Sequence, residues 1–379
     1  MGPTPYSRYV FGTLPWYSVL ILMGICLALW LATREEKRLG LPQDTVVDLA
    51  LWLIPAGIVG ARVYYVLFAW DVFRDNPVSV LYVWQGGLAI YGAILAGVAA
   101  ALAFSRKRKL ALGTLTDLIV PGLALAQALG RWGNYFNMEA YGLTVTDPAW
   151  QFFPFAVLIP GPEGGVWHMA TFFYESVWDF SVFAALMLLR RRTLRRGDLT
   201  LWYALLYGGG RLIVEGLRLD SLMTTGGSAR VSQLLSVALC VGVTGLFAWR
   251  TLRKSGLRVL LPAAVLAACA VAATLLLPRP APAFLGYEAA WCVLSALAVG
   301  IGAALLCGAT SPVRRLAGAL PPLCVALTAG IRCGFASAGI SGTEASTALC
   351  ALLTLTCLTA AGTIYPQLTR ASAADAAAR

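Results

Sequence analysis

The sequence predicts an all-α, polytopic integral membrane protein: a seven-helix core followed by about four additional C-terminal transmembrane helices. Hydrophobic residues make up 59% of the 379 positions and charged residues 12%, whereas soluble domains carry about 25% charged residues. Apolar segments of about 20 residues, long enough to cross a bilayer, recur along the chain. Cations gather in short runs between these segments, as in the cytoplasmic loops of membrane proteins.

Seven apolar segments in the first part of the chain are the predicted spans of the core. They are residues 15–33, 46–69, 78–104, 114–136, 170–189, 199–217 and 231–249. The loops on one side of these spans contain 16 Lys and Arg residues, and those on the other side contain four. The positive-inside rule therefore predicts an N-terminus on the outer side and residue 250 on the inner side.

The composition changes near residue 256, where Ala, Leu and Cys begin to dominate. Further spans are predicted at 259–277, 285–308, 317–333 and 346–365. We therefore treat 1–255 as the core domain and 256–379 as a C-terminal hydrophobic extension without a chemical signature. Seven of the nine cysteines follow residue 260, no CxxC pair occurs, and the chain has one histidine. The sequence therefore predicts neither a disulfide framework nor a metal site.

Polar residues recur in one half of the predicted core spans. They are Tyr17, Arg62, Gln85, Arg131, Asn134, Asn137, Glu139, His168, Glu175, Tyr207, Arg211, Glu215, Arg218 and Gln233. An ionisable group at membrane depth costs roughly 3 kcal/mol on insertion scales, so such groups mark functional sites. Their common depth predicts one polar cavity facing the outer leaflet.

The cations that give the net charge of +11 cluster in the loops between the apolar segments. The sequence therefore offers no domain-sized basic face that could bind nucleic acid.

Three of these groups indicate chemistry. Arg131 and Asn134 lie on one helical face, where an arginine can bind phosphate in a bidentate manner; the alternative is a cap for the helix carbonyls. Arg211 and Glu215 are four residues apart and can pair across one turn; the alternative is a purely structural ion pair. The Gly-rich stretch at 85–92 interrupts an apolar segment, as at a cavity lining or a close helix crossing.

At this level of detail the sequence resembles a known family. Gly130 to Glu139, followed by Tyr141-Gly142, resembles the signature of prolipoprotein diacylglyceryl transferases. Other elements of that family follow the same order and cover about residues 1–255. They are Trp16-Tyr17, the segment 60–68, the segment 84–92, His168 with 173–175, the segment 207–218, and 233–236.

The resemblance implies a transferase in the bacterial cytoplasmic (inner) membrane, with its active site facing the outer leaflet. Such an enzyme transfers the sn-1,2-diacylglyceryl group of phosphatidylglycerol to the lipobox cysteine thiol of a prolipoprotein. A thioether forms and glycerol phosphate is released, the first step of bacterial lipoprotein maturation. The implied partners are phosphatidylglycerol, lipobox-containing signal peptides and membrane lipids. No cofactor is implied, and the oligomeric state stays open.

The residues that match the family motifs supply the candidate site. The predicted catalytic residues are Arg131, Arg211, Glu139, Glu215, Tyr17 and Gln85. The predicted substrate-binding residues are Arg131, Asn134, Asn137, Tyr207, Arg211, Arg218, Arg62, Gly86 and Gly87. We assign the phosphate and headgroup to the two catalytic arginines, and the orientation of the arginines to the two glutamates. The asparagines can bind either the glycerol hydroxyls or a phosphate oxygen.

One position departs from the family pattern. Well-studied members carry a histidine where this chain has Gln85, and an amide cannot act as a base. A free thiol has a pKa of about 8.5, so it needs a base or a cationic field. We therefore expect the arginines to activate the thiol, aided by Glu139 or Glu215. A transporter of an anionic lipid or solute is the alternative; it predicts polar groups on both sides of the midplane.

Overall fold

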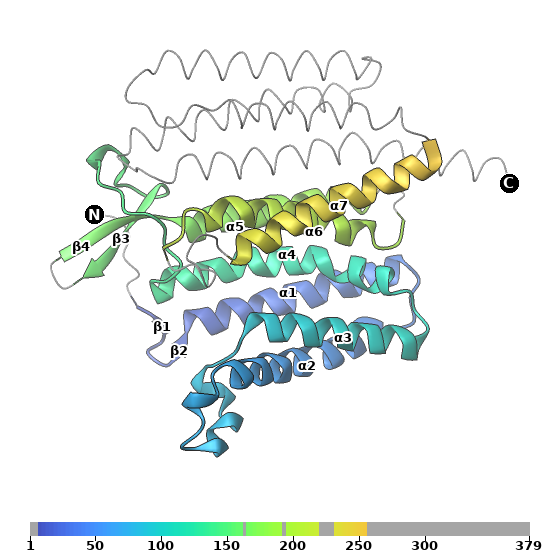
Figure 1. Ribbon diagram of the computed structural model, residues 1–379, viewed down its shortest axis with the longest axis horizontal. Helices are drawn as coiled ribbons and strands as arrows, with labels where there is room; N and C mark the ends of the chain where they lie inside the picture. Colours follow the sequence, from blue (N-terminus) through green and yellow to red (C-terminus); the bar gives the residue numbers. More distant parts are fainter. Residues whose placement is uncertain (1–6, 162–163, 192–194, 220–230, 256–379) are drawn as a thin grey trace, which may run out of the picture. The chain divides into compact units, whose positions relative to one another are not determined.

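The computed structural model describes residues 7–161, 164–191, 195–219 and 231–255 (Figure 1). The four spans predicted after residue 258 lie outside these ranges. The described part is mostly helical, and five of its helices are long and apolar enough to cross a membrane. The prediction of an integral membrane protein rich in helices is confirmed to this extent.

The helices follow the predicted spans closely, with one exception. They are α1 (Trp16–Arg38), α2 (Thr45–Phe68), α3 (Ile90–Arg108), α4 (Leu112–Asn137), α5 (Thr171–Leu189), α6 (Asp198–Glu215) and α7 (Val231–Ser255). The five membrane-length helices are α1 to α5. Helix α6 ends before Arg218, so this residue lies beyond the helix and not in its last turn.

The exception is the third span, which was predicted to begin at residue 78 but begins at Ile90. The preceding segment forms three short 3₁₀ turns, η1 (Trp70–Val72), η2 (Pro77–Leu81) and η3 (Val83–Gln85). Gly86 and Gly87 then take φ angles of 91° and 69°, which side chains disfavour and glycine permits. Gln85 therefore lies ahead of the helix, which corrects its predicted place two turns inside it.

Two small antiparallel sheets correct the all-α prediction. Strands β1 (Tyr9–Val10) and β2 (Leu14–Pro15) form one, and β3 (Ala156–Gly161) and β4 (Gly164–Met169) form the other. His168 lies in β4 opposite Val157, ahead of the helix whose span was predicted to begin at residue 170. Another short stretch of chain bridges Gly142 to Arg218 and Thr144 to His168. A fourth 3₁₀ turn, η4 (Pro148–Trp150), precedes β3.

The chain divides into two compact units, which are described separately. Among the described residues, the first comprises 7–21, 127–161, 164–191, 201–219 and 231–255, and the second comprises 22–126 and 195–200. In the second unit, α2 and α3 cross at glycines: a Cβ added to Gly60 would lie 2.6 Å from the carbonyl oxygen of Gly92. Such small residues let the backbones of membrane helices approach closely.

Carboxylates cap helix N-termini in the second unit. Glu36 accepts a hydrogen bond from the backbone N–H of Val46 at 2.6 Å. Asp117 accepts from the backbone N–H groups of Gly197 at 2.6 Å and Thr200 at 2.8 Å. These bonds satisfy N–H groups that α2 and α6 leave without helical partners. The start of α6 is thereby fixed to α4 within this unit.

In the first unit, α5 is joined to both α4 and α6 by indole hydrogen bonds. Trp132 of α4 donates to the hydroxyl of Ser176 at 3.1 Å, and Ser176 donates to the carbonyl of Ala128 at 2.8 Å. Trp178 of α5 donates to the carbonyl of Leu206 at 2.9 Å. A Cβ on Gly210 would overlap this indole, so the glycine makes room for the contact. These bonds fix the orientation of α5 relative to α4 and α6, the three helices that carry the charged residues of the candidate site.

Candidate active site

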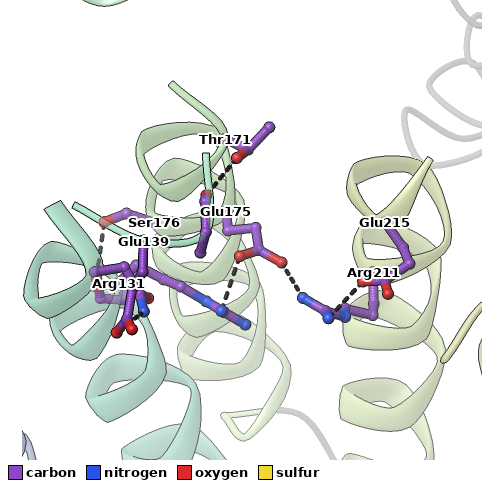
Figure 2. Close-up of polar contacts among 10 residues, drawn as sticks. Arg131, Glu139, Thr171, Glu175, Ser176, Arg211 and Glu215 are labelled. Atoms are coloured by element: carbon purple, nitrogen blue, oxygen red, sulfur yellow. Dashed lines mark hydrogen bonds and ion pairs between the residues drawn. The ribbon is translucent and has the colours of Figure 1, made fainter. Parts of the chain in front are cut away.

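A chain of ion pairs joins three helices of the first unit (Figure 2). Glu175 of α5 lies between two arginines, with Oε2 at 2.9 Å from Nη1 of Arg131 and Oε1 at 2.5 Å from Nη1 of Arg211. Nη2 of Arg211 lies 2.5 Å from Oε2 of Glu215, one turn along α6. The predicted pairing of Arg211 with Glu215 is confirmed, and Glu175 is the additional partner that connects both arginines.

The burial of this cluster makes the pairing necessary. Glu175 is 5% exposed and Glu215 is 2% exposed, and removing one partner of a buried ion pair leaves a charge without compensation. The contact of Arg131 with Glu175 is an ion pair and not an aligned hydrogen bond. Two guanidinium groups are thereby held at fixed positions around one carboxylate, which is the property that an anion-binding site requires.

A further acid lies one turn along α5. Asp179 is 3% exposed, and its Oδ2 has no hydrogen-bond partner among the residues that the structure describes. Glu175 and Asp179 are the two acids of α5, and they are four residues apart in an otherwise apolar helix. The sequence placed Glu175 in the predicted polar cavity but not among the catalytic or substrate-binding residues, and it gave Asp179 no role. The four-residue spacing of the two acids within a membrane-length segment was the signal that should have marked Asp179 as well.

Glu139 organises the end of α4. Its Oε1 accepts hydrogen bonds from the side-chain amides of Asn134 at 3.0 Å and Asn137 at 3.1 Å. Nε of Arg8, one of the four cations in the predicted outer loops, donates to Oδ1 of Asn137 at 3.1 Å. Glu139 therefore orients the side-chain amides of the two asparagines. The carboxylate that contacts Arg131 belongs to Glu175 and not to Glu139.

The backbone around Glu139 is unusual. Met138 and Ala140 have φ angles of 54° and 57°, a left-handed conformation that costs side-chain-bearing residues energy. The hydroxyl of Thr171 donates to the carbonyl of Ala140 at 2.6 Å and fixes this turn to the start of α5. Such strain persists where the surroundings enforce it, often at functional sites.

Two tyrosines complete the predicted set on the helices. The ring of Tyr17 packs directly on Gly133, since a Cβ there would overlap the ring. Tyr207 stacks on Tyr203 with ring centroids 5.6 Å apart, and the Tyr203 hydroxyl donates to Oε1 of Gln127 at 2.8 Å. Tyr17 is therefore held against α4, and Tyr207 lies one turn before Arg211 on α6.

His168 and Arg218 are both joined to the short stretch of chain at Gly142. Nδ1 of His168 is 3.0 Å from the carbonyl oxygen of Gly142, and its ring centroid is 4.6 Å from that of Tyr141. Burial lowers the pKa of His168, and the hydrogen bond to Gly142 opposes this shift. Gly142 also bridges to Arg218, so this short strand joins β4 to the residues after α6.

The remaining predicted residues belong to the second unit. Arg62 is 7% exposed and donates hydrogen bonds to the backbone carbonyls of Gly86 and Gly87 at 2.7 and 3.0 Å. Gln85 immediately precedes them and is exposed. The structure thus brings Arg62, Gly86 and Gly87 together in one unit, and Arg131, Arg211 and Glu215 in the other. Among the described residues, no cluster of three or more His, Cys, Asp or Glu can hold a metal ion.

The fold and this site define an integral membrane protein with an organised charged centre on helices that are otherwise apolar. Comparison with known proteins identifies its family. The family model for Prolipoprotein diacylglyceryl transferase matches residues 9–249. The chain belongs to the prolipoprotein diacylglyceryl transferase family, a family of enzymes.

Individual relatives agree with this assignment, and the three described next are each named phosphatidylglycerol–prolipoprotein diacylglyceryl transferase. The protein of Shouchella clausii is 43% identical over 239 residues, covering 62% of this chain and 86% of that protein. That of Limosilactobacillus reuteri is 45% identical over 233 residues, covering 60% and 84%. That of Enterococcus faecalis is 44% identical over 230 residues, covering 60% and 82%.

Proposed function

We propose that this protein transfers the diacylglyceryl group of phosphatidylglycerol to the lipobox cysteine of prolipoproteins, the first step of lipoprotein maturation. The names of its relatives support this substrate pair. The observation that carries the proposal is the pair of arginines, Arg131 and Arg211, held around Glu175. A transporter is not favoured, because the family to which the chain belongs consists of enzymes.

The reaction places specific demands on this site. The thiol sulfur attacks the glyceryl carbon that bears the phosphate ester; a C–S bond forms and the C–O bond breaks. The bonding electrons leave with glycerol phosphate, and the thiol proton passes to the phosphate or to solvent. Fixed guanidinium groups in a site of low dielectric stabilise the charge that grows on the leaving phosphate. We assign this role to Arg131 and Arg211.

The other residues of the first unit take supporting roles in the proposal. Asn134 and Asn137, oriented by Glu139, bind the glycerol hydroxyls of the headgroup. Glu215 orients Arg211, and Tyr17, Tyr207 and Arg218 line the substrate path. Gln85 cannot act as a base, so the cationic field lowers the pKa of the bound peptide thiol. Glu139 or Glu215 assists by passing the thiol proton to the phosphate or to solvent.

The membrane arrangement follows from the charge of the loops. We place the protein in the bacterial cytoplasmic membrane, with the N-terminus outside and the active site facing the outer leaflet. Residues 1–255 form the seven-span transferase core in this proposal. We assign no catalytic part to the extension at 256–379, for which the sequence predicts about four further spans.

The test uses the full chain in lipid nanodiscs that contain phosphatidylglycerol, with a synthetic lipobox peptide. Mass spectrometry measures the diacylglyceryl adduct on the peptide cysteine. We expect an adduct with the unaltered protein and with Arg74→Ala, which removes an exposed arginine between α2 and α3. We expect none with Arg131→Ala or Arg211→Ala. A folded, unaltered protein that yields no adduct would refute the proposal.

A further inference from the structure

Arg62 is surrounded by backbone carbonyl groups. Nε donates to Val80 at 2.7 Å, Nη1 donates to Gly86 at 2.7 Å and Gly87 at 3.0 Å, and Nη2 donates to Ser79 at 2.7 Å. A longer bond of 3.5 Å joins Nη2 to the carbonyl of Tyr82. A guanidinium has five N–H donors, so every donor of Arg62 is directed at the segment between α2 and α3.

This arrangement leaves Arg62 poorly suited to touch a ligand itself. Its side chain is buried, and its guanidinium carbon lies 4.9 Å from the centroid of the Phe73 ring. A Cβ on Gly87 would lie 2.6 Å from Nη1 of Arg62. Only glycine therefore lets the backbone come this close to the guanidinium. Arg62 therefore determines the conformation of the Gly86-Gly87 backbone.

The orientation of those carbonyls has a consequence for the neighbouring N–H groups. In a planar trans peptide, the C=O of one residue and the N–H of the next point in opposite directions. The carbonyls of Gly86 and Gly87 both point at Arg62, so the N–H groups of Gly87 and Leu88 both point away from it. Neither N–H group has a hydrogen-bond partner within the described part of the chain.

Two adjacent backbone donors, with their carbonyl ends held by a cation, match the requirements of an oxyanion. Backbone N–H groups of this kind stabilise oxyanions because their dipoles are oriented before the ligand binds. Gly87 is partly exposed and Leu88 is exposed, so both are accessible to a ligand. The segment also carries Gln85, which the sequence associates with catalysis.

We propose that Arg62 is a positioning residue that makes an anion site from the backbone N–H groups of Gly87 and Leu88. The ligand is a phosphate oxygen of the lipid headgroup or of the released glycerol phosphate. This inference rests on the proposed transferase function and deepens it. It replaces the expected direct contact of Arg62 with substrate by an indirect one through the peptide planes.

The first test measures the two amides directly by hydrogen–deuterium exchange in the full chain. The protein is placed in phosphatidylcholine nanodiscs, alone, with phosphatidylglycerol, or with soluble glycerol phosphate. We expect anionic lipid to slow exchange at Gly87 and Leu88 by about tenfold or more, because a hydrogen bond to a charged group contributes at least that much. Protection by glycerol phosphate as well would show that the shared phosphate is recognised. Unchanged exchange in the presence of phosphatidylglycerol would overturn the inference.

The second test separates positioning from direct contact. Lysine keeps the charge of arginine but has three donors and no planar fork, so Arg62→Lys cannot hold five carbonyls. We expect Arg62→Lys and Arg62→Gln to raise the KM for phosphatidylglycerol by a similar factor, about tenfold, and to abolish the lipid-dependent protection. Arg74→Lys is the matched control. A KM for Arg62→Lys close to that of the unaltered protein would contradict positioning.

The two tests also distinguish this inference from the proposed function. Exchange protection is measured without the peptide and needs no turnover. Protection without any peptide adduct would refute the transferase but support the anion site. An adduct without protection would support the transferase and refute the anion site. The exchange measurement on the unaltered protein tests the anion site even if the variants of Arg62 do not fold.

Discussion

The ion pairs of Glu175 give a prediction whose size follows from the structure. Glu175→Gln preserves the shape of the side chain but removes the charge that two guanidinium groups share. An amide oxygen can accept from one arginine, so at least one charge-assisted bond is lost at a residue that is 5% exposed. A hydrogen bond to a charged group contributes about 1.5–3 kcal/mol, and breaking a buried pair costs about 3–5 kcal/mol. We take about 2–3 kcal/mol for this isosteric change.

That free energy converts into a rate. If the arginines contribute mainly when charge develops on the leaving phosphate, about 2–3 kcal/mol lowers kcat/KM by roughly 30- to 150-fold. Glu215→Gln removes a partner from Arg211 alone, so we expect a loss of about tenfold. The assay is the initial rate of peptide lipidation in nanodiscs, followed by mass spectrometry at several concentrations of phosphatidylglycerol.

A matched control makes the result interpretable. Glu35 is also a buried glutamate paired with an arginine, Arg38, at the C-terminal end of α1. Glu35→Gln should leave kcat/KM within about twofold of the unaltered protein, because a pair of this kind acts on stability alone. A Glu175→Gln protein with unaltered kcat/KM, or a loss equal to that of Glu35→Gln, would refute the reasoning.

Three further predictions concern packing, the end of α4 and pH. Gly60→Ala should lower the apparent Tm of the purified protein, since overpacking costs about 1–3 kcal/mol. Gly57→Ala on the same helix is the control and should leave the Tm unchanged, because its added Cβ meets open space. Equal Tm values for the two variants would contradict the glycine crossing. Arg8→Gln should raise the KM for phosphatidylglycerol by about threefold with little change in kcat, because it removes one exposed hydrogen bond; an unchanged KM would exclude this role. Because the pKa of His168 is lowered by burial, the unfolded chain takes up its proton first, so stability should be complete above pH about 6.5 and fall as the pH decreases below it. Thermal unfolding between pH 7 and pH 5 should show a smaller loss of Tm for His168→Gln, and an equal loss would contradict the assignment.

The helices of the described chain were largely predictable because a membrane span must satisfy its own backbone. Chains that cross hydrocarbon without water form helices, so length and apolar composition predicted α1, α2, α4 and α5 within a few residues. The start of α3 was not predicted, because the residues ahead of Ile90 are as apolar as a helix. Hydropathy carries no information about the positive φ angles of Gly86 and Gly87 that end the turn there.

The same distinction applies to the site. Arg211 and Glu215 were paired from their spacing alone, because neighbours on one helix are fixed by helix geometry. The carboxylate that joins Arg211 to Arg131 belongs to another helix, and only tertiary packing shows that it faces both. Arg62 was recognised as an unusual intramembrane cation, but the sequence does not show that its donors face carbonyls.

The position of Glu175 between two arginines affects how strongly this centre can bind a phosphate. In the free protein, each of the two arginines already has an anionic partner in Glu175. In the proposed reaction a phosphodiester binds beside this counter-ion, through guanidinium N–H groups that Glu175 does not occupy. The negative charge of Glu175 then offsets part of the attraction between the arginines and the phosphate. The same repulsion favours the departure of the glycerol phosphate product.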